Sequence, residues 1–169
     1  GGALVVTEKF RPKHWLQLMK EHCVNAIYLI PSKLMLLHKF IEKPNNLVQT
    51  IISGSQAMGR EEAQKLAVSF PKAELTLYYG ASELNYITFI KGRNMTDDRT
   101  DVGMPFKCVG ISINNEEIFI DTPYHVEEIQ LPFSLKDRGY VDEAGHLHFS
   151  GRTDDIVSVN GLKVSVAKI

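Results

Sequence analysis

The chain has 169 residues, 44% hydrophobic and 23% charged, a composition typical of a globular protein that buries a core. Nineteen basic residues against twenty acidic residues leave a net charge of -1, which gives no long-range attraction for a nucleic acid, so no partner of that class is expected. No apolar run approaches the ~20 residues that span a bilayer, and no signal-peptide pattern opens the chain, so we expect a cytoplasmic protein without a membrane span. Cys23 and Cys108 lie far apart and outside any CxxC pattern, and we expect both thiols to be reduced and mostly buried.

Two kinds of segment alternate through the first eighty residues. Runs rich in β-branched and aromatic residues are typical of strands covered on both faces, and they occur at residues 3–7, 25–30, 47–53 and 75–79. Between these runs, apolar residues recur at helical spacing from Pro12 to Cys23, from Ser32 to Ile41 and from Ala63 to Phe70. This order predicts a parallel βαβ-type sheet with right-handed crossovers. Ligands of such sheets bind beyond the carboxyl ends of the strands, where "SGSQAM" (53–58) and "GASE" (80–83) fall.

The pattern changes after about residue 84. "YITFI", "GISIN", "EEIFI" and "GHLHFSG" are short alternating segments that predict antiparallel strands, and "DEAG" (142–145) predicts a tight turn. The sequence therefore predicts an α/β fold, in which a parallel βαβ-type sheet is followed by a small antiparallel β-barrel-like subdomain. A linker is expected near residues 151–155.

The segment "YYGASE" (78–83) combines groups that suit a nucleotide. A glycine after a strand lets backbone approach a ligand, and an aromatic ring beside it can stack on a purine. Ser82 offers a hydroxyl to a phosphate oxygen, and Glu83 offers carboxylate oxygens to Mg²⁺. The alternative interpretation is a loop with a turn glycine and a solvated glutamate.

Asp137 and Arg152 flank a predicted hairpin, whose two strands can bring them to one end. A carboxylate there can accept hydrogen bonds from both hydroxyls of a ribose, and a guanidinium can pair with sugar or phosphate oxygens. Alternatively, the two side chains simply pair with each other across the hairpin.

Other polar clusters favour structural roles. His146 and His148 share one face of a strand, but no nearby side chain completes a metal shell, so we interpret them as exposed strand histidines. Asp97, Asp98 and Asp101 are expected in a solvated loop. The sequence lacks a GxSxG elbow and a GxGxxG fingerprint, which argues against hydrolase chemistry and a dinucleotide fold.

Six segments, taken in order, resemble consecutive signatures of the acyl-adenylate-forming (AMP-binding) superfamily. They are "ISGSQAM", "YYGASE", "DVGMP", "EEIFI", "DRGYVDEAGHLHFSGRTDD" and "VNGLKV". Acyl-CoA synthetases, aryl-CoA ligases and the adenylation domains of peptide synthetases belong to it. The resemblance implies a fragment of a longer protein. Residues 1–100 would be the α/β part of the large domain, 101–152 a β subdomain, and 153–169 a hinge with the first strands of the small C-terminal domain.

The resemblance also implies a role for each matching residue. Ser55, Gln56 and Ala57 match a loop that lies against adenine, and Tyr79, followed by the nucleotide-binding Gly80, matches the aromatic on the other face. Asp137 matches an acid that binds ribose.

The catalytic roles fall on three other positions. Ser82 matches the hydroxyl that touches the α-phosphate, Glu83 the Mg²⁺ ligand, and Arg152 an arginine that contacts ribose and phosphate. Asp154 matches the hinge between the two domains, and Gly161 a glycine that faces the acyl acceptor.

The implied activity is that of an ATP-dependent carboxylic acid–CoA ligase, with ATP, Mg²⁺ and coenzyme A as cofactors and a small-molecule carboxylic acid as partner. Two lysines that the family uses fall outside the chain, so we expect the fragment alone to be inactive, and its oligomeric state stays open. The acid pocket is expected to include some of Tyr28, Ile30, Ser32, Met35, Ser53 and Leu84.

Two alternatives remain open. Ser55 replaces a usual glycine, Leu135–Lys136 a usual Thr–Gly, and Ser158 a common lysine, which is compatible with a degenerate member that binds nucleotide or acyl group without catalysis. The other alternative is an unrelated α/β module.

Overall fold

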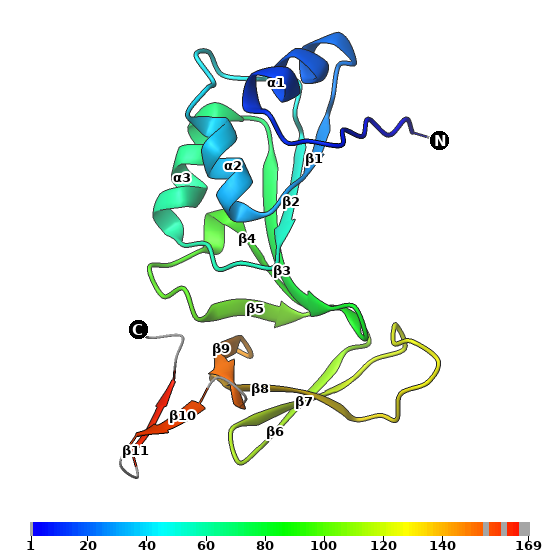
Figure 1. The fold of residues 1–169 in the computed structure, drawn as a ribbon, viewed down its shortest axis with the longest axis vertical. Coiled ribbons are helices and arrows are strands. Elements are labelled where there is room, and N and C mark those ends of the chain that lie inside the picture. Colours follow the sequence, from blue (N-terminus) through cyan, green and yellow to red (C-terminus); the bar gives the residue numbers. More distant parts are fainter. Residues whose placement is uncertain (1, 154–155, 160–161, 166–169) are drawn as a thin grey trace. The chain divides into compact units, whose positions relative to one another are not determined.

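The structure is a computed structural model that describes residues 2–153, 156–159 and 162–165 (Figure 1). The helices are α1 (Pro12–Glu21), α2 (Pro31–His38), α3 (Arg60–Ser69) and the short 3-10 helix η1 (Gly92–Asn94). The strands are β1 (Ala26–Tyr28), β2 (Thr50–Gly54), β3 (Glu74–Ala81), β4 (Asn85–Lys91), β5 (Asp101–Pro105), β6 (Gly110–Asn114), β7 (Glu117–Asp121), β8 (Phe133–Val141), β9 (Leu147–Arg152), β10 (Ile156–Val159) and β11 (Leu162–Ser165). None of the helices in this described part could span a membrane.

Nine of these strands belong to one sheet, hydrogen-bonded in the order β1-β2-β3-β4-β5-β9-β8-β7-β6. Strand β1 pairs with β2 in parallel, whereas the pairs from β4 through β5, β9, β8 and β7 to β6 are antiparallel. Strands β10 and β11 form a separate antiparallel pair. The α/β class is therefore confirmed, with a mixed sheet in place of a parallel one. The barrel-like closure of the second part stays a prediction.

The chain divides into two compact units. Unit 1 comprises residues 1–77 and 91–99, and unit 2 comprises residues 78–90 and 100–169. The division cuts β3 between Leu77 and Tyr78, so the strand that carries the "YYGASE" segment begins in one unit and ends in the other.

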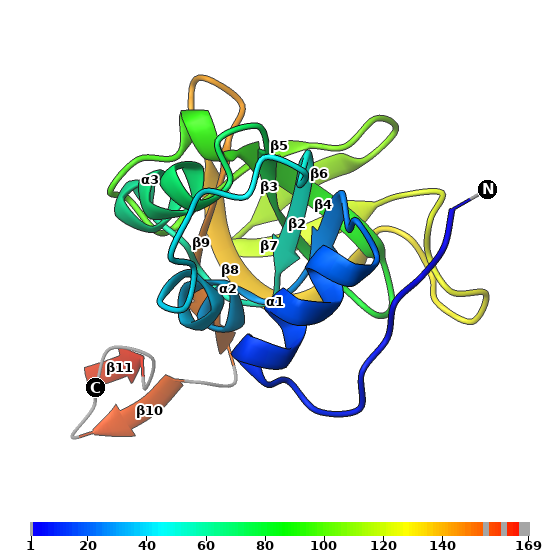
Figure 2. The ribbon, with the colours of Figure 1, turned by 90° about the horizontal axis from the view of Figure 1, so that it is seen from above.

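In unit 1, α2 and α3 lie side by side on one face of β1 and β2 (Figures 1 and 2). Alternation along the strands points Ile27 and Ile51 into the core with Leu34, Leu66 and other buried apolar side chains of the helices.

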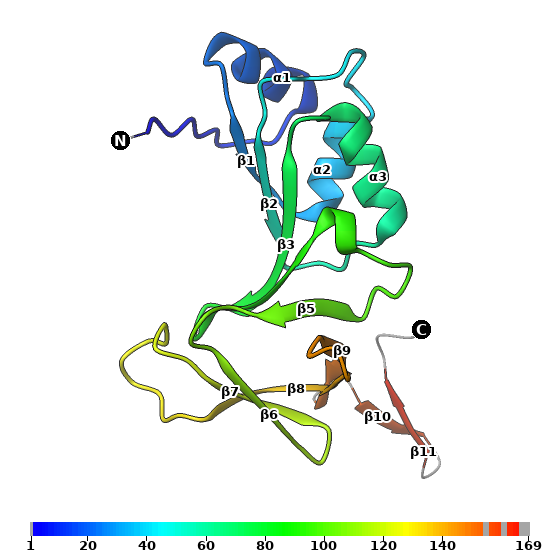
Figure 3. The ribbon, with the colours of Figure 1, turned by 180° about the vertical axis from the view of Figure 1, so that it is seen from behind.

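The opposite face of these strands is not covered by the helices of unit 1, as Figure 3 shows from behind. On that face the side chain of Tyr28 is 64% exposed and that of Ile52 is 38% exposed. The expectation of strands covered on both faces is thus wrong for the described part of the chain, because its helices form a layer on one side only.

The run at residues 3–7 is not a strand. Leu4 and Val6 are both strongly exposed, and the segment is attached at its end, where the Trp15 indole donates a hydrogen bond of 2.9 Å to Thr7 Oγ1. β-branched residues favour a strand only where a neighbouring strand offers a ladder and a surface to pack on, so propensity alone gave the wrong prediction here.

Both cysteines are exposed free thiols, so the expectation that they are buried is wrong. Cys23 and Cys108 occupy positive-φ positions, at 49° and 66°, in irregular segments after α1 and β5. Residues with positive φ usually lie in surface turns, and the tendency of an apolar thiol to be buried is too weak to change this.

Unit 2 has its own apolar core, formed by strand residues that alternate with outward-facing ones. Its fully or almost fully buried members are Leu84, Ile87, Val109, Ile118, Ile120 and Leu147. Strand β5 approaches β4 closely at Gly103, which has a φ of +86° and where an added Cβ would lie 2.0 Å from the carbonyl oxygen of Phe89. The glycine of the "DVGMP" segment is therefore required by the packing of two strands.

Candidate nucleotide site

Three of the predicted site residues come together in unit 2. Antiparallel pairing of β8 with β9 sets Asp137 opposite Arg152, and Tyr79 reaches the same carboxyl group from β3. The Tyr79 hydroxyl donates a hydrogen bond to Asp137 Oδ2, and Arg152 Nε lies 3.4 Å from Asp137 Oδ1. Tyr79 and Asp137 are 58 positions apart in the sequence, so only the tertiary fold joins them.

The surroundings of this cluster hold the carboxyl group in place. Asp137 is 6% exposed, and the Tyr79 ring packs against Phe149 with 5.8 Å between centroids. Burial, the hydrogen bond to Asp137 and its negative charge together raise the pKa of the Tyr79 phenol far above its usual range, while Arg152 opposes this shift. The phenol therefore stays protonated at neutral pH and acts as a permanent donor to Asp137.

Arg152 is anchored at two points. Besides its ion pair with Asp137, its guanidinium donates a hydrogen bond of 3.2 Å to the carbonyl oxygen of Leu135. The side chain of Arg152 remains about half exposed, so its other donors can reach a ligand. Both interpretations of the hairpin hold in part, since the strands bring the residues to one end and the residues pair there. Contact of either residue with a ribose stays a prediction.

The segment after Tyr79 forms a tight connection between β3 and β4. Strand β3 continues to Ala81, so Gly80 lies within it, and a Cβ at Gly80 would lie 2.0 Å from the carbonyl oxygen of Asn85. This close approach explains the glycine without a ligand. Ser82 and Glu83 are exposed in the turn, where the Glu83 carbonyl oxygen accepts a hydrogen bond of 2.9 Å from Val126 N–H.

Lys136, next to Asp137, was not assigned a partner from the sequence. Its backbone φ is +62°, and its ammonium lies 3.0 Å from Glu117 Oε1. Glu117 also accepts a hydrogen bond from the Ser134 hydroxyl, and that bond, followed by Lys136, lowers the pKa of its carboxyl group. The charge of Lys136 is therefore directed to a carboxylate on β7.

The predicted adenine loop, Ser55–Ala57, follows β2 in unit 1 and is exposed. Ser55 has a φ of 66°, the left-handed region that a glycine adopts without strain, which accounts for the glycine usual at this position. The Gln56 side chain accepts a hydrogen bond at Oε1 from the backbone N–H of Ser32, over 3.0 Å. The hinge residue Asp154 and the hairpin residue Gly161 lie outside the described residues.

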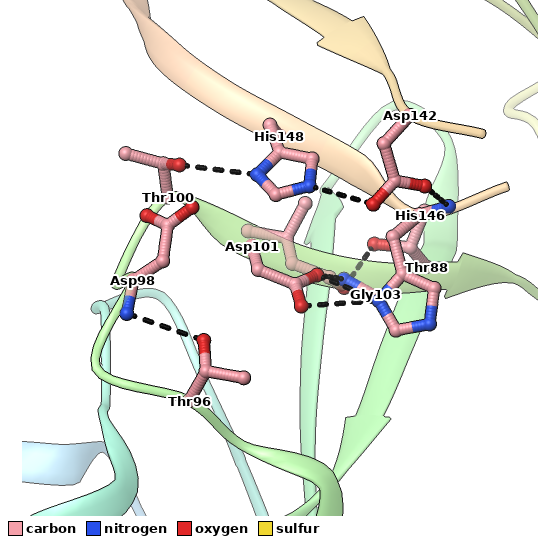
Figure 4. A network of polar contacts seen from close by, with 10 residues as sticks. Thr88, Thr96, Asp98, Thr100, Asp101, Gly103, Asp142, His146 and His148 are labelled. Carbon is pink, nitrogen blue, oxygen red and sulfur yellow. Dashed lines mark hydrogen bonds and ion pairs between the residues drawn. The ribbon is translucent and has the colours of Figure 1, made fainter. Parts of the chain in front are cut away.

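A second polar network connects β5 with β9 (Figure 4). His146 Nδ1 lies 3.0 Å from the Asp101 carboxylate, whose side chain is only 9% exposed. His148 is 8% exposed, and its Nε2 lies 3.1 Å from Asp142 Oδ2 while its Nδ1 lies 3.3 Å from Thr100 Oγ1. Because a carboxylate only accepts, Nε2 must carry a proton, and a neutral ring then accepts from the Thr100 hydroxyl at Nδ1.

This network corrects two expectations. His148 is buried, and Asp101 belongs to a strand and receives a hydrogen bond of 2.8 Å from Gly103 N–H. In the described ranges of the chain, no group of three or more His, Cys, Asp or Glu side chains could hold a metal ion. The sequence did not indicate these partners, which are Asp101 in β5, Thr100 directly before β5 and Asp142 directly after β8.

A pocket of about 740 Å³ lies in unit 1 beside α3 and η1. Its lining includes Phe70, Leu75 and Arg93, but none of the residues predicted to bind a nucleotide. The pocket is therefore separate from the candidate site.

The fold is that of an adenylate-forming enzyme. A solved structure with the same fold is the O-succinylbenzoate coenzyme A synthetase MenE of Bacillus subtilis in complex with ATP and magnesium ion, with a TM-score of 0.81 and 17% sequence identity over 94% of this chain and 38% of that one. The family model for the AMP-binding enzyme matches residues 1–123. The chain thus belongs to the AMP-binding enzyme family, and the resemblance of its motifs is confirmed.

Curated relatives are ligases of more than one kind. The chain is 28% identical to an uncharacterised acyl-CoA ligase, YhfT, of Bacillus subtilis (strain 168), over 97% of this chain and 38% of that protein. It is 29% identical to the 3,4-dihydroxybenzoate–[aryl-carrier protein] ligase of Bacillus anthracis, over 95% of this chain and 37% of that protein. The chain therefore spans well under half the length of these relatives.

Proposed function

We propose that this chain is part of an ATP-dependent ligase that activates a small carboxylic acid as an acyl adenylate and transfers the acyl group to coenzyme A. Membership of the AMP-binding enzyme family supports the first step. The observation that carries the proposal is the carboxylate of Asp137, nearly buried and oriented by the Tyr79 phenol and by Arg152. A carboxylate fixed in this way is suited to accept two hydroxyl groups of a ribose.

The remaining nucleotide contacts are proposed from the match of these residues to the motifs of the AMP-binding enzyme family. The ring of Tyr79 and the polypeptide at Ser55–Ala57 are proposed to contact adenine, and Gly80 would allow backbone to approach the nucleotide. Arg152, half exposed beside Asp137, is proposed to donate to ribose and phosphate oxygens. These contacts position the nucleotide, and positioning alone can contribute roughly 7–11 kcal/mol in ideal cases.

Ser82 and Glu83 fit the phosphate and Mg²⁺ by their donor atoms. Both lie exposed in the turn between β3 and β4, and hydroxyl and carboxylate oxygens are the ligands that this hard cation prefers. When bound, Mg²⁺ would neutralise charge on the phosphates. Glu83 would hold the cation, and Ser82 would donate its hydroxyl hydrogen to the α-phosphate.

The proposed reaction has two displacement steps. A carboxylate oxygen of the acid attacks the α-phosphorus of ATP, the bond to the β-phosphate oxygen breaks, and pyrophosphate leaves. The thiolate of coenzyme A then attacks the acyl carbon, and AMP leaves with the electron pair of the carbon–oxygen bond. Each step brings anions together, so hydrogen-bond donors at the phosphate are the groups that lower its barrier. A ligase with these substrates is expected in the cytoplasm.

The test is acid-dependent ATP–pyrophosphate exchange by the full-length protein that contains this chain, across a panel of fatty and aromatic acids. Glu83→Gln and Asp137→Ala should each lower exchange at least tenfold, which corresponds to about 1.4 kcal/mol of barrier. Asp97→Asn, an exposed carboxylate outside the site, is the matched control and should leave exchange unchanged.

Each outcome of this assay selects one interpretation. Normal exchange in both site variants would overturn the proposal. Nucleotide binding by the unaltered protein without exchange for any acid would favour the degenerate, non-catalytic alternative. Exchange followed by transfer to a carrier protein, with none to coenzyme A, would keep the first step and replace the acceptor. The 169 residues alone are expected to show no turnover.

A further inference from the structure

The start of helix α2 donates a hydrogen bond to a side chain outside the helix. The first turn of a helix has N–H groups without intrahelical acceptors, and a Ser, Thr, Asp or Asn side chain at the N-cap usually satisfies one of them. Here the N-cap is Ile30, which has no acceptor in its side chain. The N–H of Ser32 is instead satisfied by Gln56 Oε1 at 3.0 Å, from a residue 24 positions further along.

The two segments that this bond joins are also held together by hydrogen bonds between the residues that precede them. Leu29 N–H donates to the carbonyl oxygen of Ile52 over 3.2 Å, and the Ser53 hydroxyl donates to the carbonyl oxygen of Leu29 over 2.7 Å. Ser53 is 1% exposed, so this part of the connection is fixed by the core. Residues 55–57 are exposed, and the Gln56 side chain links this loop to the first turn of α2.

Under the proposed function these two segments lie near different ligands. Ser32 belongs to the set from which the sequence predicts the wall of the acid pocket, whereas Ser55–Ala57 is the loop proposed to contact adenine. We infer that Gln56 is a positioning residue that couples the acid subsite to the nucleotide subsite through its hydrogen bond to Ser32. This inference rests on the proposed function, and it gives the Gln56 side chain a role separate from the adenine contact proposed for its loop.

The coupling follows from the geometry of the bond. If adenine orders the loop, the Gln56 side chain is held in place and fixes the first turn of α2, and an ordered first turn in turn favours the loop position that binds adenine. Coupling of this kind is reciprocal, so each ligand should raise the affinity for the other by the same factor. The bond is exposed, so water can replace it, and its loss should cost three- to tenfold in affinity, or about 0.6–1.4 kcal/mol.

The experiment uses the full-length protein and three variants. Gln56→Met keeps the size of the side chain but removes the acceptor, whereas Gln56→Glu keeps an acceptor oxygen at a helix N-terminus, where negative charge is favoured. Gln64→Met changes an exposed glutamine on α3 and is the matched control. For each, the KM for the acid, the KM for ATP, kcat and the melting temperature are measured. The affinity for the acid is also measured with and without a non-hydrolysable ATP analogue.

Gln56→Met should raise both KM values three- to tenfold with kcat changed less than twofold, and the ATP analogue should no longer strengthen acid binding. Gln56→Glu should restore most of the coupling, and Gln64→Met should resemble the unaltered protein in every measurement. Unchanged KM values in a well-folded Gln56→Met protein would overturn the inference while leaving the proposed function intact. So would a Gln56→Glu protein as impaired as Gln56→Met. Absence of exchange by the unaltered protein with every acid would instead overturn the proposed function, and this inference with it.

Discussion

Two glycines of unit 2 allow backbone strain to be separated from steric overlap. Gly103 in β5 and Gly145 in the turn before β9 have nearly equal φ angles, +86° and +84°. A Cβ at Gly145 would meet no atom within 4 Å, whereas a Cβ at Gly103 would lie 2.0 Å from the Phe89 carbonyl oxygen and 2.8 Å from Ile90 N. Replacement by alanine therefore imposes the same unfavourable φ at both sites but a steric overlap at only one.

The expected costs differ accordingly. A non-glycine residue in the left-handed region loses roughly 1–2 kcal/mol, which we expect for Gly145→Ala. At Gly103 the carbon and oxygen atoms must separate to about 3.3 Å or more, so one strand has to move by more than 1 Å. Overpacking of this kind adds about 1–3 kcal/mol, so Gly103→Ala should cost roughly 2–5 kcal/mol in total.

The measurement is urea-induced unfolding of the chain, followed by far-ultraviolet circular dichroism. The change in the free energy of unfolding is taken from the shift of the midpoint, provided that the slope is unchanged. A loss of 2–5 kcal/mol is a large fraction of the 5–15 kcal/mol that stabilises an ordinary domain. Equal destabilisation by the two substitutions would refute the reasoning, because it would show that the overlap at Phe89 contributes nothing.

Two further substitutions test the ionisable groups of unit 2. Tyr79→Phe should remove a stabilising hydrogen bond to a charged acceptor, worth about 1.5–3 kcal/mol. Because the folded-state pKa of Tyr79 is raised, its contribution to stability is complete below about pH 10 and falls as the pH rises past the pKa of the unfolded phenol. In urea titrations between pH 7 and 11 the variant should therefore lose less stability at the alkaline end than the unaltered protein, and an equal loss would contradict this role of the phenol. Hydrogen bonds from the backbone N–H of His146 and from the His148 ring lower the pKa of Asp142. The contribution of Asp142 to stability is therefore present above the ordinary pKa of a carboxyl group and is lost as the pH falls through the lowered pKa. Asp142→Asn should flatten the plot of melting temperature against pH below about pH 4, and an unchanged plot would contradict the role given to these bonds.

Local sequence patterns predicted the positions of the helices and strands better than they predicted which residues are exposed. Periodicity located the three helices and most strands to within a few residues, because burial of one face determines both the pattern and the structure. It failed at residues 3–7, where a strand-like run has no ladder, and it failed for the exposure of Tyr28 and of the two cysteines. Exposure depends on what packs against a surface, and that information is not local.

The candidate site shows the same limit. The order of the motifs correctly indicated the family, and the hairpin correctly brought Asp137 opposite Arg152. The hydrogen bond from Tyr79 was not predictable from either residue, because it depends on how β3 meets β8. The partners of Lys136 and His148 were missed for the same reason, because Glu117 lies on β7 and Thr100 lies directly before β5, both distant in the sequence.

The distance along the chain between Tyr79 and Asp137 has a consequence for biosynthesis. A ribosome delivers residues one after another, so a nascent chain that has exposed Tyr79 must wait for 58 more residues before the acceptor of its phenol emerges, and for Arg152 after that. Until then the phenol has only water or a transient partner, and the Asp137 carboxylate is not yet held between Tyr79 and Arg152. The site can therefore bind a ligand only late in translation, and a chain released early would contain Tyr79 without Asp137.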